Sequence, residues 1–202
     1  MNGRRAGTGQ RPYGVLIVGV GGQGVIVASD IIAEAAMNSG FDVKKSEVHG
    51  MSQRGGTVVS HVRFGPQVWS SMIPEGQADA LIAFEQLEAL RAMHQLHANG
   101  VLITSCQRIV PPSVTTSKQA EYPQDVLQQV QAQYADAQVV DAPAEARALG
   151  SEKMASVVFV GALSRHLGFE EQAWRRAITH RVPKGTEAVN WQAFLRGQAL
   201  AS

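Results

Sequence analysis

The chain has 202 residues, of which 45% are hydrophobic and 17% charged, a composition that suits one globular α/β domain with a sizeable core. Eighteen basic and 17 acidic side chains give a formal net charge of +1, so the strongly basic footprint of a nucleic-acid-binding protein is excluded. Cys106 is the only cysteine, which excludes an internal disulfide and the roughly four thiolates of an iron–sulfur cluster.

The N-terminal residues 1–12 are basic and are not followed by the apolar segment and cleavage site of a signal peptide. The apolar run Val15 to Val20 is too short for a membrane span and is interrupted by glycine. We therefore expect a disordered lead-in over residues 1–12, a single domain over 13–202, no contact with a membrane and a cytoplasmic location. A lone thiol agrees with a reducing compartment.

The first elements in chain order predict a βαβ unit. Val15 to Val18 is a β-branched run typical of a strand buried on both faces of a parallel sheet. Val25 to Ser39 has helical periodicity and is followed by Gly40, a usual helix C-terminal residue. Phe41 to Val43 then begins a second strand.

An inserted hairpin is expected next. Residues Ser46 to Gly56 show neither helical nor strand periodicity. Thr57 to Phe64 and Gln67 to Ile73 are predicted to be antiparallel strands, joined by a turn at Gly65 and Pro66.

The remaining elements complete a doubly wound, mostly parallel Rossmann-like sheet with a helical C-terminal region. Strands are predicted over Ala78–Phe84, Val101–Thr104 and Val139–Val140. Helices are predicted over Gln86–Leu96, Gln124–Tyr134, Met154–Leu167, Glu170–Thr179 and Val189–Leu195.

Gly19 to Gly24 matches the pattern G-x-G-x-x-G between a strand and a helix. The loop residues Gly21, Gly22, Gln23 and Gly24 are candidates to bind a phosphate or another anion at the helix N-terminus. Simple tight packing, a dinucleotide site and a protein contact are the alternatives. A dinucleotide site is disfavoured because Lys44 and Lys45 stand where an acidic ribose ligand is expected.

The segment Ser46 to Gly56 concentrates three glycines with the hydrogen-bonding side chains of Glu47, His49, Gln53 and Arg54, which indicates a binding loop. A guanidinium at Arg54 is suited to bidentate phosphate binding. The candidate substrate or coenzyme A ligands in this segment are Glu47, His49, Gln53, Arg54, Gly55 and Gly56.

Together these motifs resemble one family. The sequences GVGGQG and SEVHGMSQRGGTVVSHVRFG, and later Arg181 to Lys184, are similar to the β subunit of indolepyruvate:ferredoxin oxidoreductase, which corresponds to the γ subunit or domain of 2-oxoacid:ferredoxin oxidoreductases. The resemblance extends from about Tyr13 to about Phe194. One departure is Lys153-Met-Ala-Ser156, where Lys-Ala-Ala-Asn is expected, so a role for an asparagine at Ser156 is in doubt.

The resemblance implies an accessory subunit of an enzyme that oxidatively decarboxylates a 2-oxoacid with coenzyme A and reduces ferredoxin. It also implies a hetero-oligomer in which a large α subunit carries thiamine diphosphate with Mg and the [4Fe-4S] clusters. No catalytic residue and no cofactor or metal is expected in this chain alone. The alternatives are a stand-alone nucleotide or coenzyme A binding module and an NAD(P)-dependent reductase.

Other polar residues have simpler interpretations. His94 and His97 have a spacing compatible with a metal, but no third ligand is evident, so a solvated helix face is expected. Glu85 and Glu88 are expected to stabilise a helix N-terminus. Cys106 is expected to be a buried or half-buried inert thiol.

Overall fold

The computed structural model describes residues 6–9, 11–49, 56–110 and 122–201, and for His49 its backbone alone. Six strands form one sheet in the order β2-β3-β1-β4-β5-β6. Strand β3 runs antiparallel to both of its neighbours, whereas β1, β4, β5 and β6 pair in parallel, so the expected mostly parallel sheet is confirmed. The strands are β1 Tyr13–Val20, β2 Asp42–His49, β3 Thr57–Gly65, β4 Ala78–Ala83, β5 Leu96–Ser105 and β6 Gln138–Val140.

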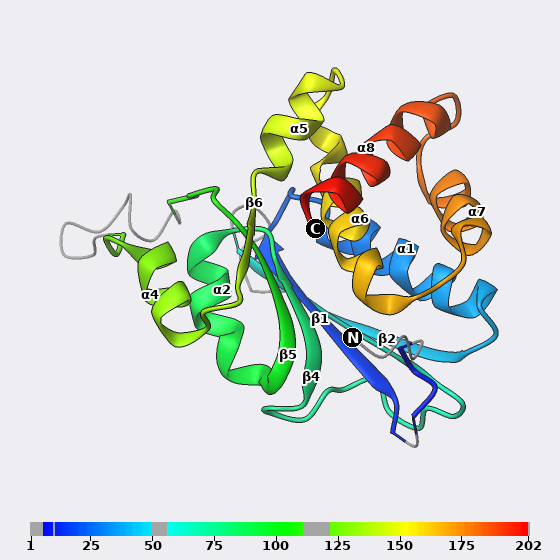
Figure 1. Cartoon of the computed structure of the whole chain (residues 1–202), viewed down its shortest axis with the longest axis horizontal. Coiled ribbons are helices and arrows are strands. Elements are labelled where there is room, and N and C mark those ends of the chain that lie inside the picture. Colours follow the sequence, from blue (N-terminus) through cyan, green and yellow to red (C-terminus); the bar gives the residue numbers. More distant parts are fainter. Residues whose placement is uncertain (1–5, 10, 50–55, 111–121, 202) are drawn as a thin grey trace.

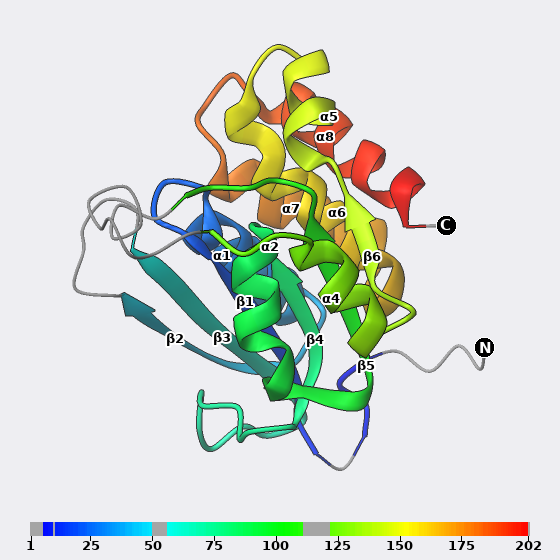
Figure 2. The ribbon, with the colours of Figure 1, turned by 90° about the vertical axis from the view of Figure 1, so that its left-hand side faces the viewer.

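Helices cover both faces of this sheet, as Figures 1 and 2 show. Helices α1, α5, α6, α7 and α8 lie on one face, and α2 and α4 lie on the other. The expected doubly wound α/β fold is therefore confirmed. The helices are α1 Val25–Asn38, α2 Gln86–Ala92, α4 Val126–Gln133, α5 Ala142–Ala148, α6 Ala155–Leu167, α7 Glu171–Arg181 and α8 Glu187–Leu200, with 3₁₀ turns η1 Met93–Gln95 and η2 Glu152–Met154.

Strand β1 lies at the centre of the sheet and separates two apolar cores. Val15 and Ile17 belong to the core beneath α1 and α6, and Leu16 and Val18 to the core beneath α2 and α4. Because successive strand residues point to opposite faces, a run that is apolar throughout must be covered on both sides. The sequence prediction for this strand is confirmed.

Helices α6 and α8 cross at two glycines. A Cβ built on Gly161 would lie 2.0 Å from the carbonyl oxygen of Phe194, and one on Gly197 would lie 1.9 Å from that of Val158. No side chain fits there, so the two backbones touch. At this contact α8 packs directly against α6.

The inserted hairpin is present, but it consists of β2 and β3, and the prediction of a strand over Gln67–Ile73 was wrong. The backbone of that segment bonds to side chains and not to a neighbouring strand. Arg63 donates to the carbonyl oxygens of Ser70 and Met72, at 3.1 and 3.0 Å. Val68 N donates to Asp42 Oδ2 at 2.8 Å. The prediction that Ser46–Gly56 is irregular throughout was also wrong, because β2 includes Ser46–His49.

The periodicity of β2 was hidden by charged residues on its covered face. Lys45 and Glu47 point toward α1, where Lys45 pairs with Asp30 and, at 2.5 Å, with Glu47. An ion pair thus replaces the apolar residues that sequence patterns rely on. Helix α5 was not predicted either; it is short, and Asp141 caps it by accepting from Ala144 N at 3.0 Å.

Part of the predicted lead-in contacts the domain. Ala6 N donates to the carbonyl oxygen of Leu167 at 3.1 Å, and a Cβ on Gly7 would lie 2.7 Å from Phe64. Over the residues that the structure describes, no helix is long and apolar enough to cross a membrane.

The connections from the strands to the helices leave a crevice beyond the carboxyl ends of the central strands β1 and β4. Strand β1 continues into α1 on one face, while its parallel neighbour β4 continues into α2 on the other face. Adjacent parallel strands whose connections diverge in this way leave a crevice beyond their carboxyl ends, where ligands of open α/β sheets bind.

Candidate functional site

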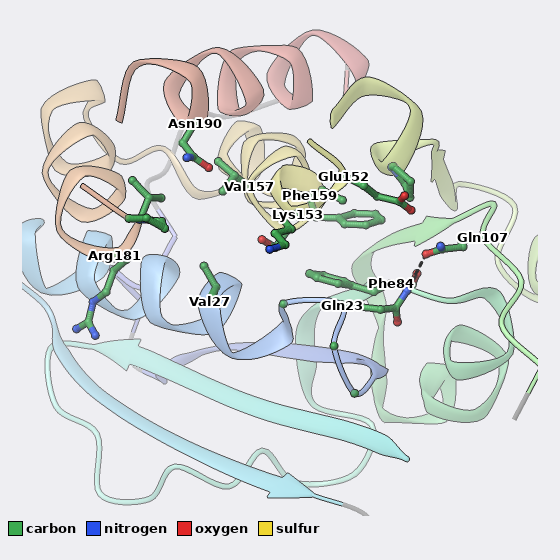
Figure 3. A pocket seen from close by; sticks show the side chains of 18 of the residues that line it. Gln23, Val27, Phe84, Gln107, Glu152, Lys153, Val157, Phe159, Arg181 and Asn190 are labelled. Carbon is green, nitrogen blue, oxygen red and sulfur yellow. Dashed lines mark hydrogen bonds between the residues drawn. The ribbon is translucent and has the colours of Figure 1, made fainter. Parts of the chain in front are cut away.

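A cavity of about 910 Å³ lies at this crevice and is shown in Figure 3. Its floor is formed by the glycine loop and the ends of β4 and β5, and its roof by the 3₁₀ turn η2 with α6, α7 and α8. The described residues that line it are Gly21, Gly22, Gln23, Gly24, Val27, Phe84, Gln107, Ile109, Pro143, Glu152, Lys153, Ala155, Ser156, Val157, Phe159, Arg181, Val182, Pro183 and Asn190.

Two glycines of the loop are required by its geometry. A Cβ on Gly19 would lie 2.9 Å from Val25 and 3.0 Å from Phe84, so the strand end packs directly against the loop. Gly24 precedes α1 with φ of +85°, a left-handed conformation that favours glycine. A Cβ on Gly24 would also lie 3.0 Å from the Cβ and Oγ of Ser156. The start of α6 therefore rests on the start of α1.

The side chain of Gln23 folds back into the protein. Its Oε1 accepts from Val20 N at 2.7 Å, and its Nε2 donates to the carbonyl oxygen of Phe84 at 2.9 Å and to Gln107 Oε1 at 2.8 Å. Gln23 thus joins the ends of β1 and β4 to the segment after β5, as Figure 3 shows for its contact with Gln107. Both amide hydrogens are used, so the side chain shapes the cavity floor.

The N-termini of α1 and α6 meet at the cavity. The first amides of a helix have no partner within the helix and carry its positive dipole end. In α6 the first of these amides, Ala155 N, donates to the carbonyl oxygen of Glu152 in η2. Ser156, in the first turn of α6, is 2% exposed and lines the cavity, and its hydroxyl has no hydrogen-bond partner among the described residues. This region is suited to an anionic group.

Two cations line the cavity, and they differ in their pairing. Arg181 is held by Glu34 and lies 3.7 Å from Asp30, and Figure 3 shows its guanidinium turned to one side. Lys153 is exposed in η2 and pairs with no carboxylate in the described part of the chain. Its neighbour Glu152 faces Arg147 at 3.4 Å. Lys153 is therefore the cation available to a ligand.

Apolar side chains make up much of the remaining wall. Phe84 and Phe159 stack with ring centroids 4.5 Å apart and an interplanar angle of 20°, and both are 1% exposed. Val27, which is 37% exposed, lies at the first turn of α1. The cavity combines an apolar wall with a positively polarised end, as sites for large organic anions do.

The structure brings only part of the predicted site together. Gly21, Gly22, Gln23 and Gly24 all line the cavity, whereas Glu47 lies outside it in the ion pair with Lys45. Gly56 touches the site through its carbonyl oxygen, which accepts from Gly21 N at 2.9 Å. Gln53, Arg54 and Gly55 lie outside the described residues, as does the side chain of His49.

Several lining residues could not be found from the sequence, among them Lys153, Ser156 and Asn190. They come from helices more than 100 residues after the glycine loop, and nothing local marks them as ligands. The one available signal was the family pattern at Lys153–Ser156 and Arg181–Lys184, because both segments line or flank the cavity.

The other polar residues behave largely as structural groups. Glu85 caps α2, accepting from Leu87 N at 2.8 Å and Glu88 N at 3.0 Å, which confirms its expected role. Cys106 is exposed, so the expectation of a buried or half-buried thiol was wrong; partial desolvation of the thiol and the nearby Asp141 raise its pKa. No group of three or more potential metal ligands occurs within the ranges that the structure describes.

The strand order argues against a dinucleotide site of the NAD type. In that fold the second strand lies next to the first, and an acidic residue at its end reaches the ribose. Here the antiparallel strand β3 lies between β1 and β2, so the end of β2 is one strand further from the glycine loop. The fold and cavity together define a doubly wound α/β domain with a candidate ligand-binding cavity beyond the carboxyl ends of its parallel strands.

Comparison with known proteins identifies the family. A family model described as pyruvate ferredoxin/flavodoxin oxidoreductase matches residues 14–200. The indolepyruvate oxidoreductase subunit IorB of Thermococcus kodakarensis is 38% identical over 196 residues, which cover 95% of this chain and 96% of that protein. The γ subunit of a keto/oxoacid ferredoxin oxidoreductase from Geobacter sulfurreducens has a TM-score of 0.68 at 25% identity, covering 94% of this chain and 98% of that chain.

The same fold occurs within a larger chain. A 2-oxoglutarate:ferredoxin oxidoreductase from Magnetococcus marinus, whose structure has 2-oxoglutarate, coenzyme A and succinyl-CoA bound, matches with a TM-score of 0.71 at 19% identity. The match covers 96% of this chain and 31% of that chain.

The chain belongs to the pyruvate ferredoxin/flavodoxin oxidoreductase family. It is an accessory small subunit of a 2-oxoacid:ferredoxin oxidoreductase and functions as part of a hetero-oligomer with catalytic subunits. Enzymes of this family use thiamine diphosphate, coenzyme A and iron–sulfur clusters. The resemblance seen in the sequence is confirmed, and the stand-alone binding module and NAD(P)-dependent reductase are set aside.

Proposed function

We propose that this chain is the small subunit of an enzyme that oxidises indolepyruvate or another aryl pyruvate. The 2-oxoacid, coenzyme A and two oxidised ferredoxins give acyl-CoA, carbon dioxide, a proton and two reduced ferredoxins. A large α subunit holds thiamine diphosphate with Mg and the [4Fe-4S] clusters, and the assembly acts in the cytoplasm. The chain from Tyr13 onward contributes one domain to it.

Two observations support this division of labour. A relative that matches over nearly the whole of both chains is named as an indolepyruvate oxidoreductase subunit. The residues of this chain do not fit an iron–sulfur cluster, since Cys106 is its only cysteine and a cluster needs about four thiolates. Electron transfer to ferredoxin must therefore use groups held by the partner.

We further propose that the cavity receives coenzyme A, and the convergence of α1 and α6 on one cavity carries this proposal. Coenzyme A is a long anion with a diphosphate, which matches two helix N-termini beside the available cation Lys153. Its pantetheine arm is uncharged, with methyl and methylene groups between its amides, and these apolar groups match the wall around Val27 and Pro183. The volume of about 910 Å³ is within the range of sites for cofactor-sized molecules.

A matched pair of variants on α1 tests this placement. Val27 and Ile26 are 37% and 39% exposed, but only Val27 lines the cavity. In the assembled enzyme, we expect Val27→Trp to fill part of the cavity and to raise the apparent KM for coenzyme A more than tenfold. Ile26→Trp is the control and leaves that KM unchanged. Equal KM values for both variants and the native enzyme would exclude this cavity as the coenzyme A site.

A further inference from the structure

Asn190 is a buried polar residue on the roof of the cavity. It lies in the first turn of α8, is 5% exposed and lines the cavity. Figure 3 shows its side chain projecting from α8 toward Val157, on the opposite side of the cavity from Gln23. A buried amide at such a position needs partners for each of its polar atoms.

The orientation of the Asn190 amide is fixed by Thr186. Thr186 Oγ1 donates its only proton to the carbonyl oxygen of Pro183 at 2.6 Å, so toward Asn190 it can only accept. The Asn190 atom 3.0 Å from Thr186 Oγ1 must therefore be Nδ2, which also donates to the carbonyl oxygen of Thr186 at 2.9 Å. A flipped amide would face two acceptors with its own oxygen.

The remaining atom, Asn190 Oδ1, has no hydrogen-bond partner among the described residues. Both Nδ2 hydrogens are donated to Thr186. The Asn190 side chain can therefore offer a ligand in the cavity only the acceptor Oδ1. A ligand that enters this part of the cavity gains a hydrogen bond if it offers an N–H or O–H donor. A phosphate oxygen there faces the partial negative charge of Oδ1 and is disfavoured.

The cavity is therefore polarised along its length. The Gly24–Ser156 contact, the N-termini of α1 and α6, and Lys153 favour an anion. The acceptor of Asn190 lies among apolar residues, including Val157, Val182 and Pro183. A ligand that satisfies both regions carries phosphate at one end and an amide on an apolar arm at the other.

We propose that Asn190 is a specificity-determining residue that accepts a hydrogen bond from an amide N–H of the pantetheine arm, while Lys153 binds the phosphates. This inference rests on the proposed coenzyme A site and assigns the orientation of the ligand within it. It requires that Asn190 and Lys153 contact different parts of the same molecule.

The test compares two acyl acceptors in the assembled enzyme: coenzyme A, and pantetheine, which has both amides but no phosphate. Asn190→Leu keeps the branching and the number of heavy atoms of the side chain and removes its hydrogen-bonding groups, both the Oδ1 acceptor and the Nδ2 donor to Thr186. It is expected to raise the KM for both acyl acceptors by about three- to tenfold, the effect of one neutral hydrogen bond. Lys153→Ala is expected to raise the KM for coenzyme A alone. Asn190→Ala replaces Asn190→Leu if the leucine variant does not assemble, and has the same expected result.

The outcomes separate this inference from the proposal beneath it. If Asn190→Leu leaves both KM values unchanged while Val27→Trp still impairs coenzyme A, the cavity binds coenzyme A but Asn190 does not select it. If Asn190→Leu raises the KM for coenzyme A and not for pantetheine, the contact is with the nucleotide and the assigned direction is wrong. If Val27→Trp has no effect either, the coenzyme A site itself is refuted.

Discussion

Loss of the Gln23 side chain should lower the free energy of unfolding of the domain, because its amide bonds to three other parts of the protein. Gln23→Leu removes an amide that bonds to Val20 N, the carbonyl oxygen of Phe84 and Gln107 Oε1. With about 1 kcal/mol for each of these three bonds, the free energy of unfolding falls by about 3 kcal/mol. For a chain of this length, that lowers Tm by about 6–12 °C.

Gln107→Leu is the matched control, because it removes one of the three bonds and leaves the other two. Its expected loss is about 1 kcal/mol, or about 2–4 °C in Tm. Thermal unfolding followed by circular dichroism on the purified chain measures both variants. Gln23→Leu with the native Tm but a raised KM for coenzyme A would refute this reasoning, since it would show that the Gln23 amide serves the ligand rather than the loop.

Three further predictions concern the binding loop, redox groups and pH. Arg54→Ala should raise the KM for coenzyme A by about ten- to a hundredfold with assembly intact, and Arg54→Lys should recover only part of the loss; an unchanged KM removes Arg54 from the site. The isolated chain should be colourless, so an absorbance band near ~400 nm with stoichiometric iron contradicts the assignment. Burial lowers the pKa of His61 and of His166, and the nearby Arg165 lowers that of His166 further. Because the unfolded chain then binds protons more readily than the folded one, the free energy of unfolding should fall as the pH drops below 6.5. His61→Gln should reduce this loss in urea unfolding at pH 7 and pH 5.5; an equal loss in both proteins rejects the role of His61.

Local patterns predicted the parallel half of the fold well. The apolar strand β1, the glycine loop and α1 followed from runs and spacings within some 25 residues. The hairpin partner was misplaced because the helix-facing side of β2 carries the half-buried Lys45 and Glu47, and Lys45 pairs with both Asp30 and Glu47, so this strand shows no apolar periodicity. A strand whose helix-facing residues are charged can be predicted from sequence only when the helix that carries the opposite charge is known, here α1 with Asp30.

The candidate site was half predictable for a similar reason. The glycine loop is a contiguous motif, and its four residues line the cavity. The roof includes Lys153, Ser156 and Asn190, which line the cavity across from the loop, and the helices of Ser156 and Asn190, α6 and α8, pack together at Gly161 and Gly197. Gln23 lines the cavity as predicted, but the bonds of its side-chain amide to the protein could not be predicted, because one of its partners is the carbonyl oxygen of Phe84, 61 residues away.

The most direct test of the central claim is anaerobic isolation of the intact assembly through a tag on this chain, followed by a reaction assay. The preparation should contain a larger subunit with iron and thiamine diphosphate, and should reduce ferredoxin with indolepyruvate only when coenzyme A is present. In a panel that includes phenylpyruvate, pyruvate and 2-oxoglutarate, the aryl oxoacids should have the highest kcat/KM. An assembly that reduces ferredoxin with none of these oxoacids, or equally well without coenzyme A, would contradict the account.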